Sequence, residues 1–376
     1  MSKMTNSMKE KFDKQFDSFC NESLLKTEAL VVAQKHNKFS SFAQHFHSIC
    51  TKTLKLQEDS VISALSRIEY TMLYSNFINR RYLASVFLYD DKGYCDEKQR
   101  LVGEFEISPL FFFFDELWDK VLSERKRYAG KVSIKDVNTC MFEALPCFYS
   151  YLINIARFVV RDCLDKGPFA DIVKNDLFRV CVGDYMAETE PVYIHNKNKD
   201  VTVLKEWFES RRPYYYVHRD CSGLDLSGGS FESTVLRYIQ LRNAVLNDVI
   251  LDNSTLIGAD FYRTQMENSS LDFTSIYEAD FSQAQLKDTS FRFVRGGAGL
   301  PDTKKWRHVG FYPVSFRNAD LTNADFHGAY LSGADFRGAT LSGADFTDAI
   351  LDDAVFSSKE LALSDDQMQN ITIELS

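Results

Sequence analysis

His218, Arg219 and Asp220 have the residue types that open the catalytic loop of a protein kinase. In such a loop the aspartate is the catalytic base, and an asparagine five residues later binds a metal ion. Here the later position is Asp225, and no glycine-rich nucleotide loop precedes the fragment. The match is therefore too short to predict phosphoryl transfer.

Histidine and cysteine side chains offer two further kinds of chemistry. His45, His47 and Cys50 are metal-ligand types, but on a helix the two histidines project from different faces, and no fourth ligand is evident. Cys140, Cys147 and Cys163 lack a histidine at a fixed spacing that could activate a thiolate. We therefore predict no catalytic residues, no metal site, no cofactor and no enzyme activity, although residues 1–210 leave this less certain.

The elements that dominate the chain are five-residue repeats with a large apolar residue at the centre. The first block has the central residues Leu226, Phe231, Leu236, Leu241, Leu246, Leu251, Leu256, Phe261, Met266, Leu271, Ile276, Phe281, Leu286 and Phe291. The second block has Phe316, Leu321, Phe326, Leu331, Phe336, Leu341, Phe346, Leu351 and Phe356. A period of five fits neither a helix nor a strand, so the chain must turn once per repeat.

The run ADLTN-ADFHG-AYLSG-ADFRG-ATLSG-ADFTD resembles the pentapeptide-repeat family. The resemblance covers about residues 224–356 and implies a right-handed quadrilateral β-helix with four repeats per coil. Such a solenoid buries a continuous apolar column. Because Phe and Leu alternate in the second block, we expect Phe to fill two opposite walls of the interior and Leu the other two.

Four repeats per coil place residues 20 apart on the same side of the solenoid. We expect one side to carry the acidic residues Asp260, Asp280 and Asp320. The neighbouring side should carry, directly after the central residues, a stripe formed by Arg237, Ile257, Tyr277 and Arg317. Exposed apolar groups on this stripe indicate a docking surface, either for the chain's own other domain or for an external partner.

Residues 295–313 interrupt the repeat. Phe291 and Phe316 are 25 residues apart, which is one repeat plus a whole coil of 20 residues. We therefore expect the sides of the solenoid to stay in register across the interruption, whether the segment is a degenerate coil or a loop. Its glycines favour a loop. The loop carries a positive and aromatic group, which we treat as candidate contacts: Lys304, Lys305, Trp306 and Arg307.

The formal net charge of −9 is concentrated in the repeats, while the residues before them are close to neutral. An acidic solenoid argues against direct nucleic-acid binding, which requires concentrated Lys and Arg. It permits the opposite relation, in which the protein mimics nucleic acid on a basic protein surface.

Residues 1–210 show no repeat and predict a separate, mainly α-helical domain with some β structure. The helices are expected at 9–33, 59–73, 111–127 and 137–161, with Pro146 kinking or starting the last. Hairpins are expected at 83–93 and 192–204. Residues 211–223 should form a junction in which Tyr214, Tyr215 and Tyr216 cap the first coil, and residues 357–376 a C-terminal tail.

Other features bear on localisation. No stretch has the 18 or more uncharged apolar residues that a membrane span needs, and the first residues lack the apolar core of a secretory signal. Eight cysteines without paired spacing indicate a reducing compartment. We therefore expect a cytoplasmic protein.

Three functions are compatible with this sequence. The leading one is a non-enzymatic interaction or scaffold protein that presents a rigid acidic β-helix to another protein, with a homodimer left open. The family resemblance implies a second, a DNA mimic that binds a type II topoisomerase. The third is an effector or defence protein whose N-terminal domain is active and whose solenoid is the targeting module, as in secreted bacterial effectors with such repeats.

Overall fold

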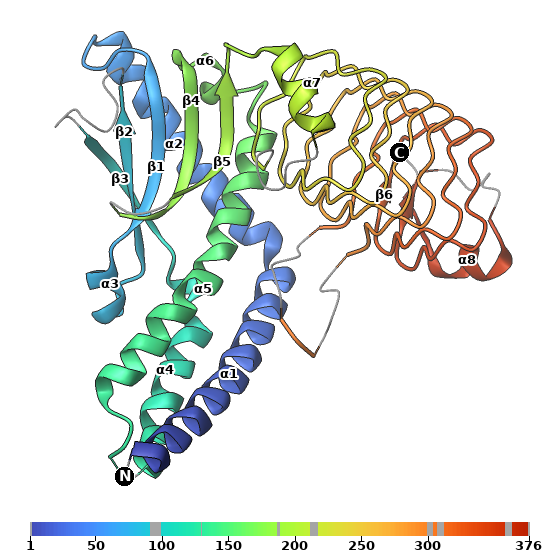
Figure 1. Ribbon diagram of the computed structural model, residues 1–376. Coiled ribbons are helices and arrows are strands. Elements are labelled where there is room, and N and C mark those ends of the chain that lie inside the picture. The colour runs from blue at the N-terminus through green and yellow to red at the C-terminus, as the bar shows by residue number, and fades with distance from the viewer. Residues whose placement is uncertain are drawn as a thin grey trace. The chain divides into compact units, whose positions relative to one another are not determined.

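The computed structural model describes residues 2–90, 99–128, 130–185, 189–210, 217–298, 304–306, 312–357 and 363–374. Contacts divide the chain into two compact units (Figure 1). The first unit comprises residues 1–195 and 300–309, and the second comprises 196–299 and 310–376. The boundary therefore falls at 195/196, before the expected 210. Of the junction expected at 211–223, residues 211–216 lie outside the described residues.

The first unit contains a five-stranded sheet in the order β3-β2-β1-β4-β5. Its strands are β1 (Leu65–Met72), β2 (Leu83–Tyr89), β3 (Arg100–Glu106), β4 (Lys174–Asp184) and β5 (Thr189–Asn196). β1 pairs antiparallel with β2 and parallel with β4, and β2 pairs antiparallel with β3. Ile68, Tyr70 and Met72 share one face of β1 and are fully buried, and this apolar face forms part of the core; Glu69 and Thr71 on the other face are also buried.

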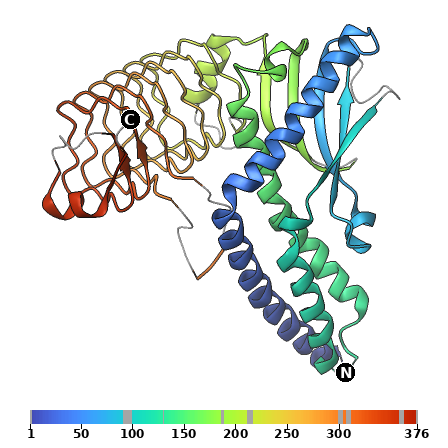
Figure 2. The same ribbon diagram turned by 180° about the vertical axis from the view of Figure 1, so that it is seen from behind.

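Two long helices, α2 (Lys35–Glu58) and α5 (Ile134–Asp162), lie against the sheet (Figures 1 and 2). Two more, α1 (Ser2–Ala33) and α4 (Phe112–Glu124), pack against each other and against α5. The short elements of this unit are α3 (Tyr74–Ile78), η2 (Ser108–Leu110), η3 (Arg125–Tyr128) and α6 (Pro168–Asp171). A capping box formed by Ser133 and Asp136 starts α5, and Pro146 lies inside this helix rather than at its start.

The structure confirms the helices expected at 9–33, 111–127 and 137–161, and the antiparallel pair that begins at 83. The helix expected at 59–73 is wrong, because these residues contain β1. The prediction of a second hairpin at 192–204 is also wrong. Asp200 accepts hydrogen bonds from the backbone N–H groups of Thr202 and Val203 and so starts helix α7 (Val201–Glu209) where a strand was expected.

In the second unit, residues 20 apart form parallel β-bridges, which builds a solenoid. The N–H of Leu241 donates to the Asp260 carbonyl at 2.8 Å, and the N–H of Asp260 donates to the Ile239 carbonyl at 2.9 Å. Each repeat then turns through a residue with positive φ, such as Gly258 at 65°. Every coil therefore satisfies the backbone groups of the next one.

The interior of the second unit contains two columns of stacked phenylalanine rings. One runs through Phe261, Phe281, Phe316, Phe336 and Phe356, with neighbouring ring centroids 4.5–5.2 Å apart. The other runs through Phe291, Phe326 and Phe346, at 5.0 and 4.9 Å. The expected separation of Phe and Leu into different walls is therefore confirmed for the second block.

Short elements cover both ends of the solenoid core. Leu204 and Phe208 of α7 belong to the same apolar cluster as the central residues, and the Phe208 ring lies 5.1 Å from that of Phe231. At the other end, β7 (Val355–Phe356) pairs in parallel with both β6 (Asp335–Phe336) and β8 (Thr372–Ile373). The tail also forms α8 (Asp365–Asn370), so it continues and closes the last coil.

The expected register across the interruption is wrong. Asp280 bridges to Ser315 and Arg295 bridges to Tyr330, so bridged partners here are 35 residues apart instead of the usual 20. The insertion therefore adds the length of three repeats and not that of a whole coil. The cause is Gly296, which completes its coil by donating its N–H to the Tyr330 carbonyl at 2.9 Å. Val314 and Ile276 fill the space where a Gly296 side chain would lie.

In the described part of the chain, no helix has the length and apolar character required to cross a membrane.

The Phe columns predict a large effect of one core substitution. Phe316→Ala should lower the free energy of unfolding by about 3–5 kcal/mol, because it removes the ring between Phe281 and Phe336 and leaves a cavity. Urea denaturation followed by circular dichroism measures this change. Phe316→Leu is the control and should cost clearly less, because Leu fills equivalent central positions. Equal effects of both variants would contradict the stacked core.

The role of α7 as a cap predicts a position-dependent effect within one helix. Phe208→Asp places a carboxylate where a side chain 1% exposed covers the first coil, so the melting temperature should fall by several degrees. Val203→Asp changes a side chain 37% exposed on the same helix and should leave the melting temperature nearly unchanged. The cap is disproved if both variants melt alike.

Candidate interaction surface

The bridging residues of the solenoid form four columns. Column A consists of Val235, Thr255, Ser275, Arg295, Tyr330 and Ile350. Column B consists of Asp220, Gln240, Asp260, Asp280, Ser315 and Asp335; column C of Asp225, Val245, Gln265, Gln285, Asp320 and Thr340; and column D of Ser230, Ile250, Ser270, Ser290, Asp325 and Asp345. Each of columns B, C and D contains at least two aspartates, whereas column A contains none.

The aspartates in these columns stabilise turns. Asp280 and Asp320 each accept a hydrogen bond from the backbone N–H two residues later, at 3.0 and 3.1 Å. Asp260 makes the same contact at 3.0 Å and also pairs with Arg242 at 3.1 Å, and it is only 4% exposed. These carboxylates are therefore largely used within the fold. Because of the insertion, Asp320 lies in column C and does not continue the column of Asp260 and Asp280.

The predicted stripe is correct in part. Arg237, Ile257 and Tyr277 directly follow the central residues on the side of column A. Arg317 is exposed but lies next to column B, because its carbonyl accepts from the N–H of Gln283. Ile257 is 7% exposed, so it is not the surface apolar group that we expected.

Two exposed phenylalanines occupy the turn that leads into column A. Phe273 is 58% exposed and Phe293 is 39% exposed, and their rings stack with centroids 5.1 Å apart. Their φ values of 58° and 56° lie in the left-handed region, which L-residues with bulky side chains adopt at a cost. His327 packs against the edge of Phe293, with ring centroids 5.4 Å apart.

Column A itself adds Tyr330 at 39% and Ile350 at 48% exposure, next to the exposed Arg295. Burial raises the pKa of Tyr277, which also lies within electrostatic reach of Arg295 and Tyr330. We call these residues, with the two phenylalanines, side A. It is an aromatic and apolar strip that carries one exposed cation, Arg295.

Glycines of neighbouring coils seat two of these rings. A Cβ atom at Gly297 would lie 2.4 Å from the Tyr330 ring, and one at Gly328 would lie 2.4 Å from the Phe293 ring. Both rings therefore lie close against the backbone. Sequence reasoning missed Phe273, Phe293, Arg295, Tyr330 and Ile350, although steps of 20 residues within each block would have aligned Phe273 with Phe293 and Tyr330 with Ile350.

The four candidate contact residues of the interruption, 304–307, do not form one exposed group. Lys304 and Lys305 are exposed, and Arg307 lies outside the described residues. Trp306 belongs to the first unit, where its indole N–H donates to the hydroxyl of Tyr151 at 3.0 Å and its backbone N–H donates to Asn21 at 2.9 Å. The indole is thus bound by α5 and the backbone of Trp306 by α1, so this side chain does not project freely.

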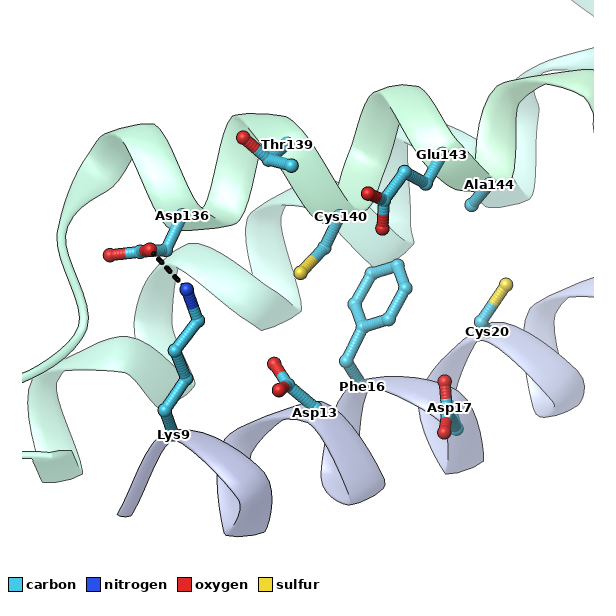
Figure 3. A pocket seen from close by; sticks show the side chains of 10 residues that line it. All are labelled: Lys9, Asp13, Phe16, Asp17, Cys20, Asp136, Thr139, Cys140, Glu143 and Ala144. Atoms are coloured by element: carbon cyan, nitrogen blue, oxygen red, sulfur yellow. Dashed lines mark hydrogen bonds and ion pairs between the residues drawn. The ribbon is translucent and has the colours of Figure 1, made fainter. Parts of the chain in front are cut away.

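In the first unit, α1 and α5 border an acidic open cavity of about 460 Å³ (Figure 3). Lys9, the cation among the described residues that line it, pairs with Asp136 at 3.0 Å. Hydrogen bonds from Ser133 and from Lys9 lower the pKa of Asp136 to about 2. Burial raises the pKa of Cys20 to about 12 and that of Cys140 to about 11, so both thiols are protonated at neutral pH and are poor nucleophiles.

The other residues considered for chemistry have structural contacts. Nδ1 of His45 lies 3.2 Å from the Tyr70 hydroxyl, and burial lowers the pKa of His45. Asp220 forms an ion pair with Lys199 at 2.8 Å and accepts the N–H of Asn196. In the described residues, no group of three or more His, Cys, Asp or Glu side chains is placed to hold a metal ion.

One buried carboxylate in the first unit has a distinctive environment. The Asp184 side chain accepts hydrogen bonds from the hydroxyls of Tyr74 at 3.0 Å and Tyr149 at 3.4 Å, both on Oδ2. Oδ1 is buried without a hydrogen-bond partner, and burial raises the pKa of Asp184. Burial likewise raises the pKa of both tyrosines, so they act as donors here.

Comparison with known proteins agrees with the repeat geometry. The family model for pentapeptide repeats matches in eight copies, at residues 236–272 and 314–357. No curated protein matches the chain. Similar solved structures include QnrB1, a plasmid-mediated fluoroquinolone resistance protein, with 15% identity over 41% of this chain and 81% of that one and a TM-score of 0.26.

Two cyanobacterial structures are also similar. Rfr23 from Cyanothece 51142 has 16% identity over 40% of this chain and 91% of its own, with a TM-score of 0.20. HetL from Nostoc sp. strain PCC 7120 is described as involved in heterocyst differentiation regulation. It has 19% identity over 41% of this chain and 95% of its own, with a TM-score of 0.12. At these identities and scores, no functional conclusion follows from the structural matches. The chain therefore contains pentapeptide repeats at residues 236–272 and 314–357, with a separate N-terminal region before them.

Proposed function

We propose that this protein is a non-enzymatic interaction or scaffold protein, and that side A of its solenoid binds another protein. The observation that carries the proposal is the exposure of Phe273, Phe293, Tyr330 and Ile350 on a single side. A contiguous apolar strip rimmed by polar groups is typical of a protein interaction site. Aromatic residues and arginine, both present here, are the residue types enriched at the centres of interfaces.

We further propose that the solenoid is a right-handed quadrilateral β-helix. Bridges between residues 20 apart and a five-residue repeat support four repeats per coil. The cytoplasm remains the proposed compartment. Its support is that seven cysteines in the described part of the chain are free thiols.

Binding to a type II topoisomerase by DNA mimicry is the second candidate. The aspartates of columns B, C and D favour it, since a DNA mimic needs carboxylates at the surface. The hydrogen bonds that hold Asp260, Asp280 and Asp320 in turns weigh against it, because these groups are less available to a partner. A gyrase supercoiling assay decides this candidate, and no effect at a large molar excess of the protein would exclude it.

An effector with an active N-terminal domain is the third candidate. Its support is Asp184, a buried carboxylate held by two tyrosine hydroxyls. If this candidate is correct, expression of the full chain should arrest growth, and Asp184→Asn should abolish the arrest while the protein remains folded. Arrest that survives this substitution would exclude Asp184 as its source.

The leading proposal predicts that side A variants lose a partner. Tyr330→Lys combined with Ile350→Lys should reduce recovery of the partner in quantitative pull-downs by at least about tenfold, because the apolar contacts are replaced by hydrated cations. Column A already contains a long cation at Arg295, so the fold should tolerate both changes. The partner identified in this way is then purified and its affinity measured directly.

The matched control uses column C. Gln285→Lys combined with Thr340→Lys adds the same charge at two exposed positions of the solenoid and should leave recovery unchanged. If the column C variant loses the partner and the column A variant keeps it, side A is not the binding surface.

A further inference from the structure

We propose that side A binds an extended, acidic peptide segment that also carries apolar side chains. The inference rests on the proposed function, because it assigns the chemistry of the partner to the same surface. It goes further in naming the sign of the partner's charge and its conformation.

The sign of the charge follows from the distribution of carboxylates. Column A lacks aspartate and glutamate, and Arg295 and Arg237 on this side are exposed. Among the neighbouring carboxylates, Asp272 accepts hydrogen bonds from the Ser290 hydroxyl at 2.5 Å and the Arg292 N–H at 3.0 Å, and Glu278 is only 3% exposed. Asp348 and Asp352, each two residues from Ile350, are exposed. An acidic segment is therefore attracted around the exposed Arg237 and Arg295, and its apolar side chains are expected to contact the aromatic and aliphatic groups of side A.

The apolar part of the partner follows from the two phenylalanines. Most turn residues with positive φ in the second unit are Gly, Asn or Asp, which adopt this conformation easily. Placing Phe273 and Phe293 there costs about 1–2 kcal/mol per residue. Because Phe273 and Phe293 remain 58% and 39% exposed, burial of their rings within the fold does not fully offset this conformational cost. Strain that places apolar groups in solvent points to a use outside the chain.

The extended conformation follows from the arrangement of side chains along the solenoid axis. Successive coils present Phe273, then Phe293, then Tyr330 and then Ile350, one large group per coil. Neighbouring coils lie about 4.8 Å apart. These groups therefore form a narrow track along the axis rather than a broad patch. Because Gly297 and Gly328 seat two of the rings, the track is rigid and loses little entropy on binding.

Selection from a random peptide library displayed on phage tests this chemistry with the full-length chain as bait. Enriched peptides should combine Asp or Glu with aromatic or aliphatic residues. Their synthetic versions should bind at least about tenfold more weakly to Arg295→Glu and to Phe273→Asn. Replacing the acidic residues of the peptide by lysine should restore part of the binding to Arg295→Glu. Gln285→Glu in column C serves as the matched control and should change the affinity little.

Phe273→Asn also separates binding from folding. Asn favours the left-handed conformation, so the melting temperature should stay the same or rise while the affinity falls. A fall in melting temperature together with affinity would mean that Phe273 serves the fold, which contradicts the inference.

Several results would overturn the inference. They are a selection without enrichment, enrichment of basic peptides, saturable binding of a poly(dT) oligonucleotide that the same variants abolish, and a dimer in analytical ultracentrifugation that Tyr330→Lys dissociates. If the pulled-down partner still depends on side A while acidic peptides fail to compete with it, the proposed function stands and only this inference fails. If the partner does not depend on side A, the proposed function fails first.

Discussion

The parallel backbone hydrogen bonds between residues 20 apart are the constraint on which the second unit depends. They fix which side chains share a column, and therefore both the stacked Phe interior and the exposed composition of each side. They also explain why Gly296 retains its place in a coil without a side chain, since its backbone bonds to Tyr330 whatever fills the interior. The same geometry concentrates the aromatic residues of side A, because a residue type repeated at this spacing forms a continuous track.

Much of the solenoid could be predicted from the sequence. The central residues and their repeat were evident because burial demands a large apolar side chain at each fifth position, and this demand does not depend on distant parts of the chain. The register across the interruption could not be predicted in the same way. Gly296 looks like part of a loop by residue type, and its membership of a coil depends on a partner carbonyl far along the chain and on Val314, which fills the space beside it. Because Gly296 was assigned to a loop, the predicted columns of Asp320 and Arg317 were wrong.

The first unit was less predictable because its strands depend on tertiary pairing. Residues 65–72 carry apolar side chains at spacings that suit either a helix or a strand, and the pairing of β1 with both β2 and β4 decides between them. Residues 201–204 looked extended by composition, but the Asp200 cap and the burial of Leu204 and Phe208 favour α7. Side A was missed for a related reason. Phe273 and Phe293 do not follow the central pattern, and their exposure becomes evident only when the coils are stacked.

Site-specific photo-crosslinking tests the central claim most directly. A benzoylphenylalanine placed at position 330 in side A, and separately at position 285 in column C, is irradiated in cells that contain the full-length protein. We predict a specific crosslinked partner for Tyr330→benzoylphenylalanine and none for Gln285→benzoylphenylalanine. A partner captured from position 285 and not from position 330 would contradict the assignment of side A as the binding surface.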